Sequence, residues 1–237
     1  MIKKILRGFI LPVILISALT ACTVGVQRTE EREISGVSAL SIATVGEFIV
    51  RQGEEESLVI EGPNNYLRNI TTEVIDGTLY IDSRRGITSS SLQKTTYTLT
   101  VQDLDEISFS GAGSIAISSF ETDDLVVTLT GAGNIEIYSL TANHLTVLLN
   151  SAGSIYIGGN TLTQDVLISG VGSYDASYLQ STTASVVLSG AGSAEVWVTD
   201  SLDVTITGVG SITYYGEPNV QQNVSGLGSI NRKDDGK

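Results

Sequence analysis

Apolar residues recur at every second position on both sides of a short glycine turn in the second half of this chain. Val127 and Leu129 precede one such turn, and Ile135 and Ile137 follow it. A period of two is typical of β-strands with one buried face. No stretch between the turns has the length or the i, i+3, i+4 spacing of a helix. The pattern therefore predicts two strands joined at each turn.

The turn recurs seven times, in steps of 18 to 20 residues. Its copies span residues 110–115, 130–135, 150–155, 169–174, 189–194, 207–212 and 225–230. A repeat of this period indicates a solenoid, in which each unit buries its apolar face against its neighbours. We therefore expect an all-β fold: a parallel β-helix, or β-solenoid, with about seven rungs of 18–20 residues over 102–231, after an irregular N-terminal β region over 33–101.

Most copies of the turn have the form Gly-x-Gly, which permits positive φ and a close approach of backbone to backbone. Because x is Ala, Val or Leu, we expect it to point into the core. Ser151 replaces the first glycine of the third copy, which predicts a wider corner there. A polar residue follows each turn, and stacking would place these residues in a ladder with a structural role: Ser114, Asn134, Ser154, Ser173, Ser193, Ser211 and Ser229. Calcium-binding β-rolls place carboxylates in such turns, so we do not expect calcium.

The first half of the chain is predicted to form strands over 37–43, 47–51, 57–61, 70–75, 78–83 and 95–101. Asp76-Gly77 lies between two of them and is a hairpin signal. We expect a single helical turn over 65–69 and a loop over 86–93. This half forms either a separate unit or the first irregular coils of the solenoid. At the other end, Gln222 takes an inward position and residues 232–237 form a charged tail, as expected of a polar cap.

Residues 1–21 have the features of a signal peptide, with a basic start and an apolar stretch too short for a comfortable membrane span. They end in Leu19-Thr20-Ala21-Cys22, which resembles the lipobox of bacterial lipoproteins. The resemblance implies cleavage before Cys22, lipid attachment there, and anchoring to a membrane. Thr23 after the cysteine favours the outer membrane. Residues 22–32 are predicted to be a tether, and this single Cys excludes an internal disulfide.

The charge distribution excludes some partners. Loss of residues 1–21 removes three positive charges and no negative ones, so the net charge of −13 becomes −16. Between Thr95 and Asn231 there are 13 acidic residues and no Lys or Arg. Such a surface repels phosphate backbones, so we expect no nucleic-acid partner. Anionic polysaccharides are equally poor partners unless cations bridge.

The order of several segments resembles one known family. A lipoprotein signal is followed by GEFIVRQG at 46–53, LVIEG at 58–62, DGTLYI at 76–81 and then the serial Ser-Gly-x-Gly-Ser units. Together these are similar to the head GIN domain family, labelled as auto-transporter adhesins, over residues 34–230. The resemblance implies a β-helical fold and a location in the cell envelope. It brings no catalytic residues.

The sequence offers little for catalysis, and we expect no enzyme, no cofactor and no metal site. His144 is the only histidine and has no distinctive neighbours in sequence, so neither a Ser-His-Asp site nor a histidine-rich metal site is favoured. Polysaccharide lyases of β-helical fold use Arg or Lys, which the predicted solenoid lacks. Asp123 and Asp124 could form a carboxylate pair of a glycoside hydrolase, but its other partners are missing. A carbohydrate-active enzyme is therefore the least favoured function.

A binding surface is the stronger prediction. Outward positions after the turn place Glu136, Tyr156, Asp175, Glu195 and Thr213 in one column, and Tyr138, Gly158, Ser177, Trp197 and Tyr215 in the next. Aromatic rings beside carboxylates suit neutral sugars, because the rings stack on the sugar and carboxylates accept from its hydroxyl groups. The alternative is that these rings only cover the strand surface. The candidate ligand or partner face is Tyr138, Tyr156, Glu136, Glu195 and Trp197.

A second outward column is apolar and consists of Leu148, Leu167 and Val187. It is a candidate contact surface for the first half of the chain or for a second copy in a homo-oligomer. The sequence thus predicts a lipid-anchored envelope module that acts by binding or adhesion, to a glycan or to an envelope or surface protein. The alternative is a periplasm-facing structural or stress-related lipoprotein. The sequence does not decide on which face of the outer membrane the module lies.

Overall fold

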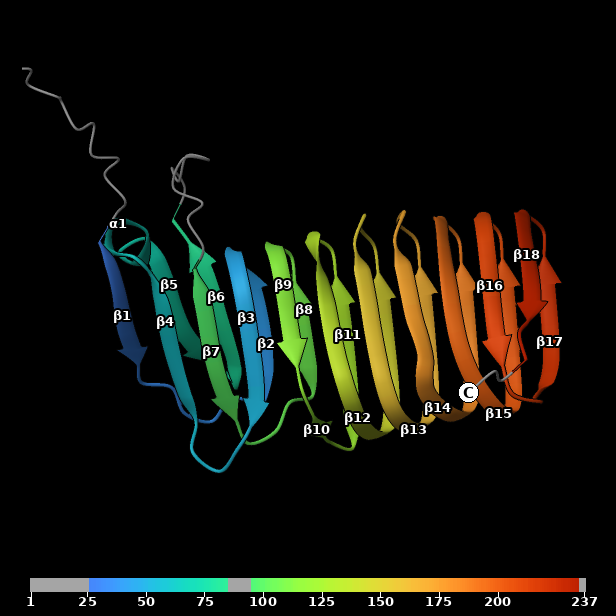
Figure 1. The fold of residues 1–237 in the computed structure, drawn as a ribbon, viewed down its shortest axis with the longest axis horizontal. Coiled ribbons are helices and arrows are strands. Elements are labelled where there is room, and N and C mark those ends of the chain that lie inside the picture. Colours follow the sequence, from blue (N-terminus) through green and yellow to red (C-terminus); the bar gives the residue numbers. More distant parts are fainter. Residues whose placement is uncertain (1–25, 85–94, 235–237) are drawn as a thin grey trace, which may run out of the picture.

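The computed structural model describes residues 26–84 and 95–234 as a rod made almost entirely of β-strands (Figure 1). Within these two ranges, all strands belong to one 18-stranded sheet, and a single short helix lies at the N-terminal end. The elements are β1 (Gln27–Arg32), β2 (Ala39–Ala43), β3 (Val45–Gln52), β4 (Ser57–Pro63), α1 (Asn64–Leu67), β5 (Ile70–Ile75), β6 (Thr78–Ser83), β7 (Thr96–Val101), β8 (Glu106–Phe109), β9 (Ala112–Ile117), β10 (Phe120–Glu121), β11 (Asp124–Leu129), β12 (Ala132–Leu149), β13 (Ser154–Ile168), β14 (Ser173–Leu188), β15 (Ala191–Ile206), β16 (Val209–Tyr215), β17 (Asn219–Val224) and β18 (Leu227–Arg232).

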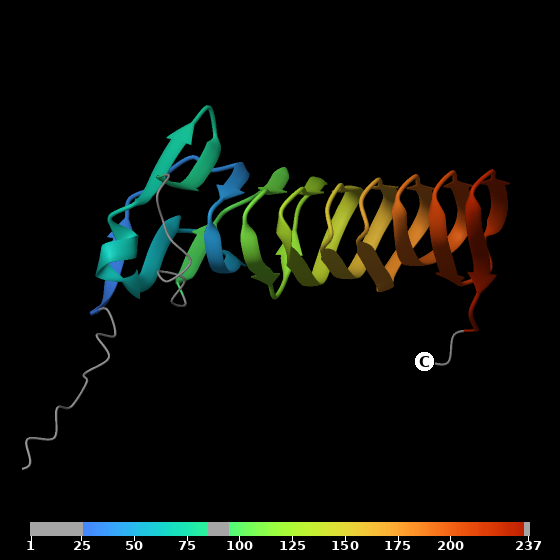
Figure 2. The same ribbon diagram turned by 90° about the horizontal axis from the view of Figure 1, so that it is seen from above.

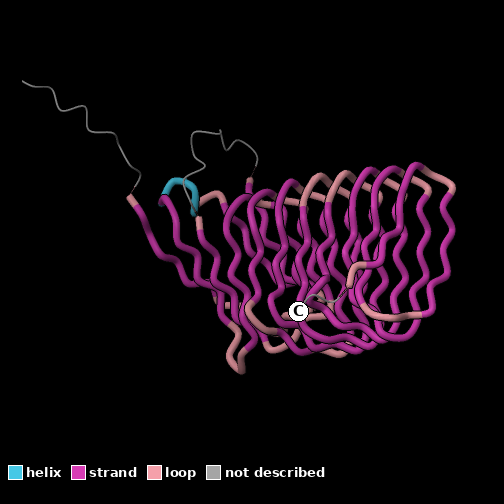
Figure 3. Tube along the Cα trace, turned by 45° about the vertical axis from the view of Figure 1, so that its right-hand side comes forward, coloured by secondary structure: helices cyan, strands magenta, loops and turns pink. Residues whose placement is uncertain are grey.

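The predicted solenoid is confirmed. From β8 onward the chain winds in one direction, and each coil pairs in parallel with the coil before it. Seven glycine corners lie along one edge, so the chain completes six turns between the first corner and the last. At about 4.8 Å a coil, this part of the rod is about 30 Å long. Loops are confined to short segments between the strands (Figure 3).

The first half of the chain extends the same rod at its N-terminal end (Figure 2). β2 and β3 form a coil that lies between two later ones, because β2 pairs in parallel with both β6 and β8, and β3 with both β7 and β9. β4 and β5 then add antiparallel strands beyond β7 and β6. Spatial order therefore differs from chain order at this end. The predicted Asp76-Gly77 hairpin is present, with both residues at positive φ.

Residues Gln27–Arg32, which the sequence assigns to the tether, form β1 and pair antiparallel with β4. β1 is therefore the outermost strand on that side of the rod. The predicted loop over 86–93 lies outside the described residues, as do Cys22 and residues 235–237 of the tail.

The core runs the length of the rod, as stacked columns of apolar side chains. Val127, Leu129, Ile135 and Ile137 are fully buried, and their equivalents in the neighbouring coils repeat this. Burial of such columns is the main stabilising term of the fold, at roughly 25 cal/mol per Å² of apolar surface removed from water. A few polar side chains are buried as well, and the largest of them is an amide. Gln164 is buried where its register partners are Leu145 and Ala184.

The corner glycines are required by the stacking itself. A Cβ on Gly190 would lie 2.0 Å from the carbonyl oxygen of Gly170, and a Cβ on Gly208 would lie 1.9 Å from that of Gly190. Middle residues of the corners also donate their N–H to the preceding coil, as Val209 does to Gly190. A side chain at these positions would push the coils apart, which explains the repeat in physical terms.

The middle residue of the corner does not point into the core, and that prediction was wrong. Val171, Val209 and Leu227 are 69%, 54% and 80% exposed. Because both neighbouring glycines lie against the preceding coil, the residue between them faces solvent. At the Ser151 corner, pairing between β12 and β13 begins only at Asn134 and Ser154, beyond the turn, but pairing between β14 and β15 also begins beyond the turn, so the wider corner stays a prediction. The polar residues after each turn stack in register, and Ser154 donates to Asn134 at 2.8 Å.

Candidate functional site

The strand that follows each corner carries the predicted ligand face. Glu136, Tyr156, Asp175 and Glu195 lie side by side on four adjacent coils, in the register that the sequence predicts. All four side chains point outward, because the residues on either side of each are buried. This column, called the acidic column below, consists of three carboxylates and one aromatic ring.

The second predicted column is partly wrong, because β-bulges shift the register just beyond the acidic column. Gly158 pairs with Tyr178, not with Ser177, and the register slips again between Ala176 and Gln180. A bulge places two residues opposite one and re-aims the side chains that follow. Ser177 is buried, and Tyr178 takes the outward place.

The resulting aromatic row consists of Tyr138, Tyr156, Tyr178, Trp197 and Tyr215. At its start, Tyr138 and Tyr178 are 54% and 57% exposed. The ring centroids of Tyr138 and Tyr156 lie 6.0 Å apart, with the planes tilted by 52°. This spacing falls in the range of a favourable aromatic pair. Three tyrosines on three successive coils thus present ring surface to solvent.

Gly158 allows these rings to approach one another. A Cβ there would lie 3.4 Å from the phenol oxygen of Tyr156 and 2.7 Å from the backbone oxygen of Tyr138. Tyr156 therefore lies over the backbone at Gly158 and fills the gap that glycine leaves between Tyr138 and Tyr178. The row remains continuous although one of its positions has no side chain.

Hydrogen bonds hold the carboxylate beside the rings. The Tyr138 hydroxyl donates to Glu136 at 2.5 Å. This bond, together with the charge of Glu136, raises the pKa of Tyr138. Partial burial raises the pKa of Tyr156, and the charge of Asp175 and the nearby Tyr178 add to the effect. Both phenols therefore stay protonated at neutral pH, and the single hydroxyl proton of Tyr138 is donated to Glu136.

The far end of the row is more closed. Trp197 is half-buried and pairs with both Gln180 and Tyr215. Tyr215 is buried, and its hydroxyl donates to Glu195 at 2.9 Å. The ammonium group of Lys233 lies 5.5 Å from the centre of the Tyr215 ring, within cation–π range. Glu195 and Trp197 thus belong to the covered end of the row.

The structure therefore brings Glu136, Tyr138 and Tyr156 into direct contact and places Glu195 and Trp197 farther along the same surface. Tyr178 is the residue that sequence reasoning missed. Its partner Gly158 lies 20 residues earlier, whereas the step between the two corners is 19 residues and predicts Ser177. The bulge that adds this one residue leaves no signal in the alternating pattern.

A buried polar network lies beneath the aromatic row. Gln164 donates to Ser181 at 2.7 Å and accepts from Tyr174 at 3.2 Å. Ser181 in turn donates to the backbone oxygen of Trp197 at 2.9 Å. Every member is buried or backbone, so the bonds replace those lost to water. The network ties three coils together below the row and fixes the bulged register.

The predicted apolar column is also in register, since Leu148 pairs with Leu167 and Leu167 with Val187. Leu167 is 37% exposed. The first half of the chain does not cover it, because that half lies at the end of the rod (Figure 2). A shallow groove of about 520 Å³ follows the neighbouring corners, lined by Ala152, Val171, Ala191, Val209 and the adjoining glycines and serines. This edge is free of charge, because no Asp, Glu, Lys or Arg lies within four residues before or after the first corner position in any of the seven copies.

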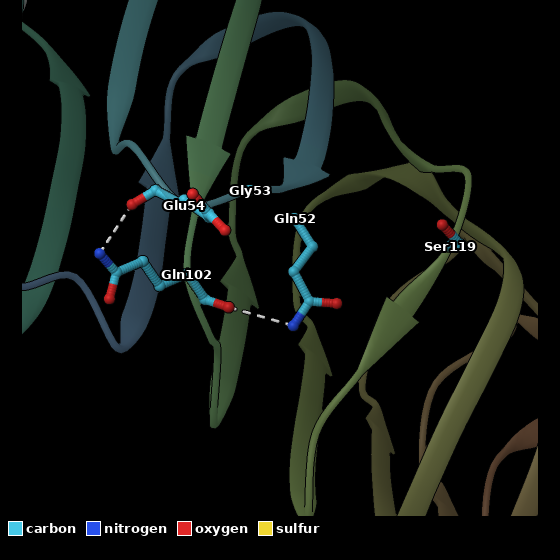
Figure 4. Close-up of a pocket in the computed structure, with 5 residues that line it drawn as sticks. All are labelled: Gln52, Gly53, Glu54, Gln102 and Ser119. Atoms are coloured by element: carbon cyan, nitrogen blue, oxygen red, sulfur yellow. Dashed lines mark hydrogen bonds between the residues drawn. The ribbon is translucent and has the colours of Figure 1, made fainter.

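A second pocket, of about 570 Å³, lies where the N-terminal coils meet the solenoid (Figure 4). Its lining is Gln52, Gly53, Glu54, Gln102 and Ser119. The amide of Gln52 donates to the backbone of Gln102 at 3.0 Å, and that of Gln102 donates to the backbone of Glu54 at 2.8 Å. These amides hold the crossing chain segments together, so the pocket has a structural explanation.

The described residues offer no arrangement typical of catalysis. His144 is exposed, and its Nδ1 lies 2.7 Å from the hydroxyl of Thr163. Asp123 accepts from the side chain of Asn143 at 2.7 Å, within a corner. No group of three or more His, Cys, Asp or Glu side chains in residues 26–84 and 95–234 is placed to hold a metal ion. Within the same ranges, no helix has the length and apolarity needed to cross a membrane.

Comparison with known proteins identifies the family. A family model described as "Putative auto-transporter adhesin, head GIN domain" matches residues 38–218. The chain belongs to this family. The matched region includes β2 to β16 and therefore the whole aromatic row.

Solved structures share the fold. An adhesin from Bacteroides fragilis, described as putative, is 28% identical with a TM-score of 0.85, and the match covers 87% of this chain and 97% of that one. A "putative lipid binding protein" from Parabacteroides distasonis is 23% identical with a TM-score of 0.67, over 87% and 96% of the two chains. A protein from Parabacteroides merdae, described as a putative adhesin, is 23% identical with a TM-score of 0.62, over 87% and 96%. No curated protein matches the chain.

Proposed function

We propose that this head GIN protein is a lipid-anchored envelope protein that acts by binding, as an adhesion module, and not by catalysis. The label of the family and the adhesin from Bacteroides fragilis support this role. The lipobox-like sequence ending at Cys22 supports an anchor in the outer membrane. The −16 charge that the chain would carry after cleavage keeps such a rod soluble and apart from phosphate-rich surfaces.

The ligand face is the first half of the aromatic row with its carboxylate: Glu136, Tyr138, Tyr156 and Tyr178. The observation that carries this proposal is the ring pair of Tyr138 and Tyr156, with Tyr178 on the next coil and Glu136 bonded to Tyr138. Rings stack on the apolar face of a sugar, and the carboxylates and phenols bond its hydroxyl groups. Since the acidic column repels anions, the ligand is a neutral glycan. Coils about 4.8 Å apart suit an extended chain lying along the rod.

Titration of the purified full-length chain with a panel of neutral and acidic oligosaccharides tests the proposal. Loss of one stacked ring should weaken binding by roughly 2- to 10-fold, the equivalent of about 0.5–1.5 kcal/mol, in Tyr156→Ala and in Tyr178→Ala. Trp197→Ala should weaken it less, because that ring is half-buried. Tyr80→Ala is the matched control, since Tyr80 is an exposed tyrosine on β6, far from the row. Equal affinity in wild type and the Tyr156 and Tyr178 variants would remove this face from consideration.

A further inference from the structure

The two ends of the rod are built differently. At the N-terminal end the outermost strands are β1 and β5, which run antiparallel to their neighbours. β1 carries charges of both signs at Arg28, Glu30, Glu31 and Arg32, and charged side chains protect an edge from pairing. At the C-terminal end, among the described residues, β17 pairs only with β15, and β18 only with β16. That end therefore presents two open edges, one on each side of the last coil (Figure 1).

The last coil also leaves a cross-section of the core uncovered. Val224 is 44% exposed, whereas its register partner Ile206 is fully buried. Gln222 is exposed and continues the column in which Val204 is buried. Val220 and Ile230 are only partly buried. The end surface thus consists of apolar side chains around one amide, between two open strand edges.

The electrostatics of this end differ from the rest of the rod. Residues 218–233 contain no Asp or Glu, and their only charges are Arg232 and Lys233. Both turn back toward the preceding coil. Arg232 pairs with Glu217 at 2.8 Å, and Lys233 lies over Tyr215. Glu217 and Asp234 flank this segment and balance the two cations, so this end is close to neutral and a second copy meets less repulsion here than along the acidic rest of the rod.

We propose that the C-terminal end of the rod binds the same end of a second copy, so that two rods join into one. A single strand from another protein would cover one edge only. An identical end covers both edges and the core between them. The two copies would be related by a two-fold axis that is perpendicular to the long axis of the rod and to the faces of its sheet. Under this symmetry β17 lies antiparallel to β17 of the second copy, and β18 lies antiparallel to β18 of the second copy. Two six-residue pairs give about ten hydrogen bonds, as many as a typical specific interface has.

Gln222 explains the choice of a second copy. In the register that places Gln222 opposite Gln222 of the second copy, the core-facing side chains of the two strands lie opposite each other. Val220 then faces Val224 of the second copy, and the two Gln222 amides face each other. An amide both donates and accepts, so the two can bond to one another. A single buried amide of this kind sets register in other assemblies. Each copy contributes its C-terminal end to this contact, and no C-terminal end is left over for a third copy. Assembly therefore stops at a dimer.

The backbone at this edge is free to pair. The N–H of Ser225 donates to Ile206 on β15. Because N–H directions alternate along a strand, the N–H groups of Val220, Gln222 and Val224 point toward the open side. Proline at position 222 would therefore remove a donor for the second copy without removing a bond within the chain.

Light scattering or native mass spectrometry of the full-length chain in detergent, over a range of protein concentration, tests the proposal. We expect a dimer. Gln222→Glu puts two like charges face to face and should raise the dissociation constant at least about tenfold, as should Gln222→Pro. Asn223→Asp is the matched control, with the same added charge on the outer surface beside Thr205, and should remain dimeric. Circular dichroism confirms that each variant is folded.

Three results would overturn this inference. The first is a chain that stays monomeric at all concentrations. The second is a dimer that both Gln222 variants leave intact. If Leu167→Glu dissociates that dimer, the contact lies at the apolar column instead. The third is a series of species larger than two, which would mean that the rods join head to tail.

Discussion

A methyl group on Gly131 would lie 2.0 Å from the carbonyl oxygen of Gly111, one coil earlier at the same corner. The two residues are held at this distance because Ala132 donates its N–H to Gly111 and Gly131 donates to Phe109. Coil spacing and glycine content are therefore linked: parallel pairing brings the corners together, and at Gly131 no side chain fits without a shift of the backbone.

Replacement of a corner glycine should destabilise the rod. We expect Gly131→Ala to lower the free energy of unfolding by at least about 2 kcal/mol, because backbone must move to admit the methyl group. For a chain of this size that equals a loss of roughly 4–8 °C in Tm. Ala132→Ser at the adjacent exposed position is the control and should change little. Thermal unfolding followed by circular dichroism measures both. Equal stability of wild type and Gly131→Ala would show that the corners yield easily.

The third corner should gain stability from the opposite change. Ser151 stands where the other six corners have glycine, and its hydroxyl is buried without a hydrogen-bond partner in the described structure. An unsatisfied buried hydroxyl costs about 1–3 kcal/mol. We expect Ser151→Gly to raise the free energy of unfolding by about 1 kcal/mol, because the greater freedom of unfolded glycine offsets part of the gain. Ser151→Ala separates the two effects, since it removes the hydroxyl but keeps the Cβ. Urea titration of all three chains gives the comparison, and a less stable Ser151→Gly chain contradicts the expectation.

Stability should fall in alkaline solution because of the buried tyrosines. Burial raises the pKa of Tyr174, with the Asp175 charge adding to the effect, and burial likewise raises that of Tyr97. Unfolded tyrosines lose their protons near pH 10, so above this pH the folded state holds more protons than the unfolded state. The stabilisation is complete below pH 10 and is lost as pH rises, by about 1.4 kcal/mol per pH unit for each such group.

Tyr174→Phe should make that loss shallower by one group. It should also lower stability at pH 7 by about 1–3 kcal/mol, because Gln164 loses a donor inside the core. Urea unfolding between pH 7 and 11.5 shows both effects. An unchanged slope above pH 10 in the variant would mean that Tyr174 does not carry the dependence.

The long columns of the rod follow from the sequence because strand alternation has a fixed period. An alternation with a period of two residues places Glu136, Tyr156, Asp175 and Glu195 on one surface without any knowledge of the fold. Parallel stacking of coils whose corners lie at the same position then brings these residues into register. The inner columns are predictable for the same reason.

The predictions that were wrong concern features that depend on contacts between coils. Ser177 and Tyr178 exchange places because a bulge inserts extra residues, and nothing in the local alternation marks it. The exposed middle residue of each corner follows from how closely the glycines approach the coil below, which is a property of the stack. The insertion of β2 and β3 between later coils is likewise invisible, because one coil has the same pattern wherever it lies in the rod.

Lipid attachment should depend on Cys22 alone. Because Cys22 is the single cysteine and ends the lipobox-like segment, cells fed an alkyne-tagged fatty acid should label the wild-type chain, and Cys22→Ser should abolish the label. Thr23→Ser is the control, since it changes the neighbouring position and should keep the label. A labelled Cys22→Ser chain would exclude the anchor that we propose.

The adhesion role requires the rod to lie outside the cell, and a C-terminal tag can establish this. Protease resistance of the rod itself is uninformative, because strands paired on both sides are cleaved only after local unfolding. A specific protease site with an epitope after Lys237 avoids that problem, since added peptide next to the last coil needs no unfolding. We expect the epitope to be removed from intact cells while a periplasmic marker carrying the same site stays whole. If the epitope is cut only after the outer membrane is broken, the domain faces the periplasm. A glycan bound at Tyr156 would then belong to the envelope itself, and the structural alternative would replace adhesion.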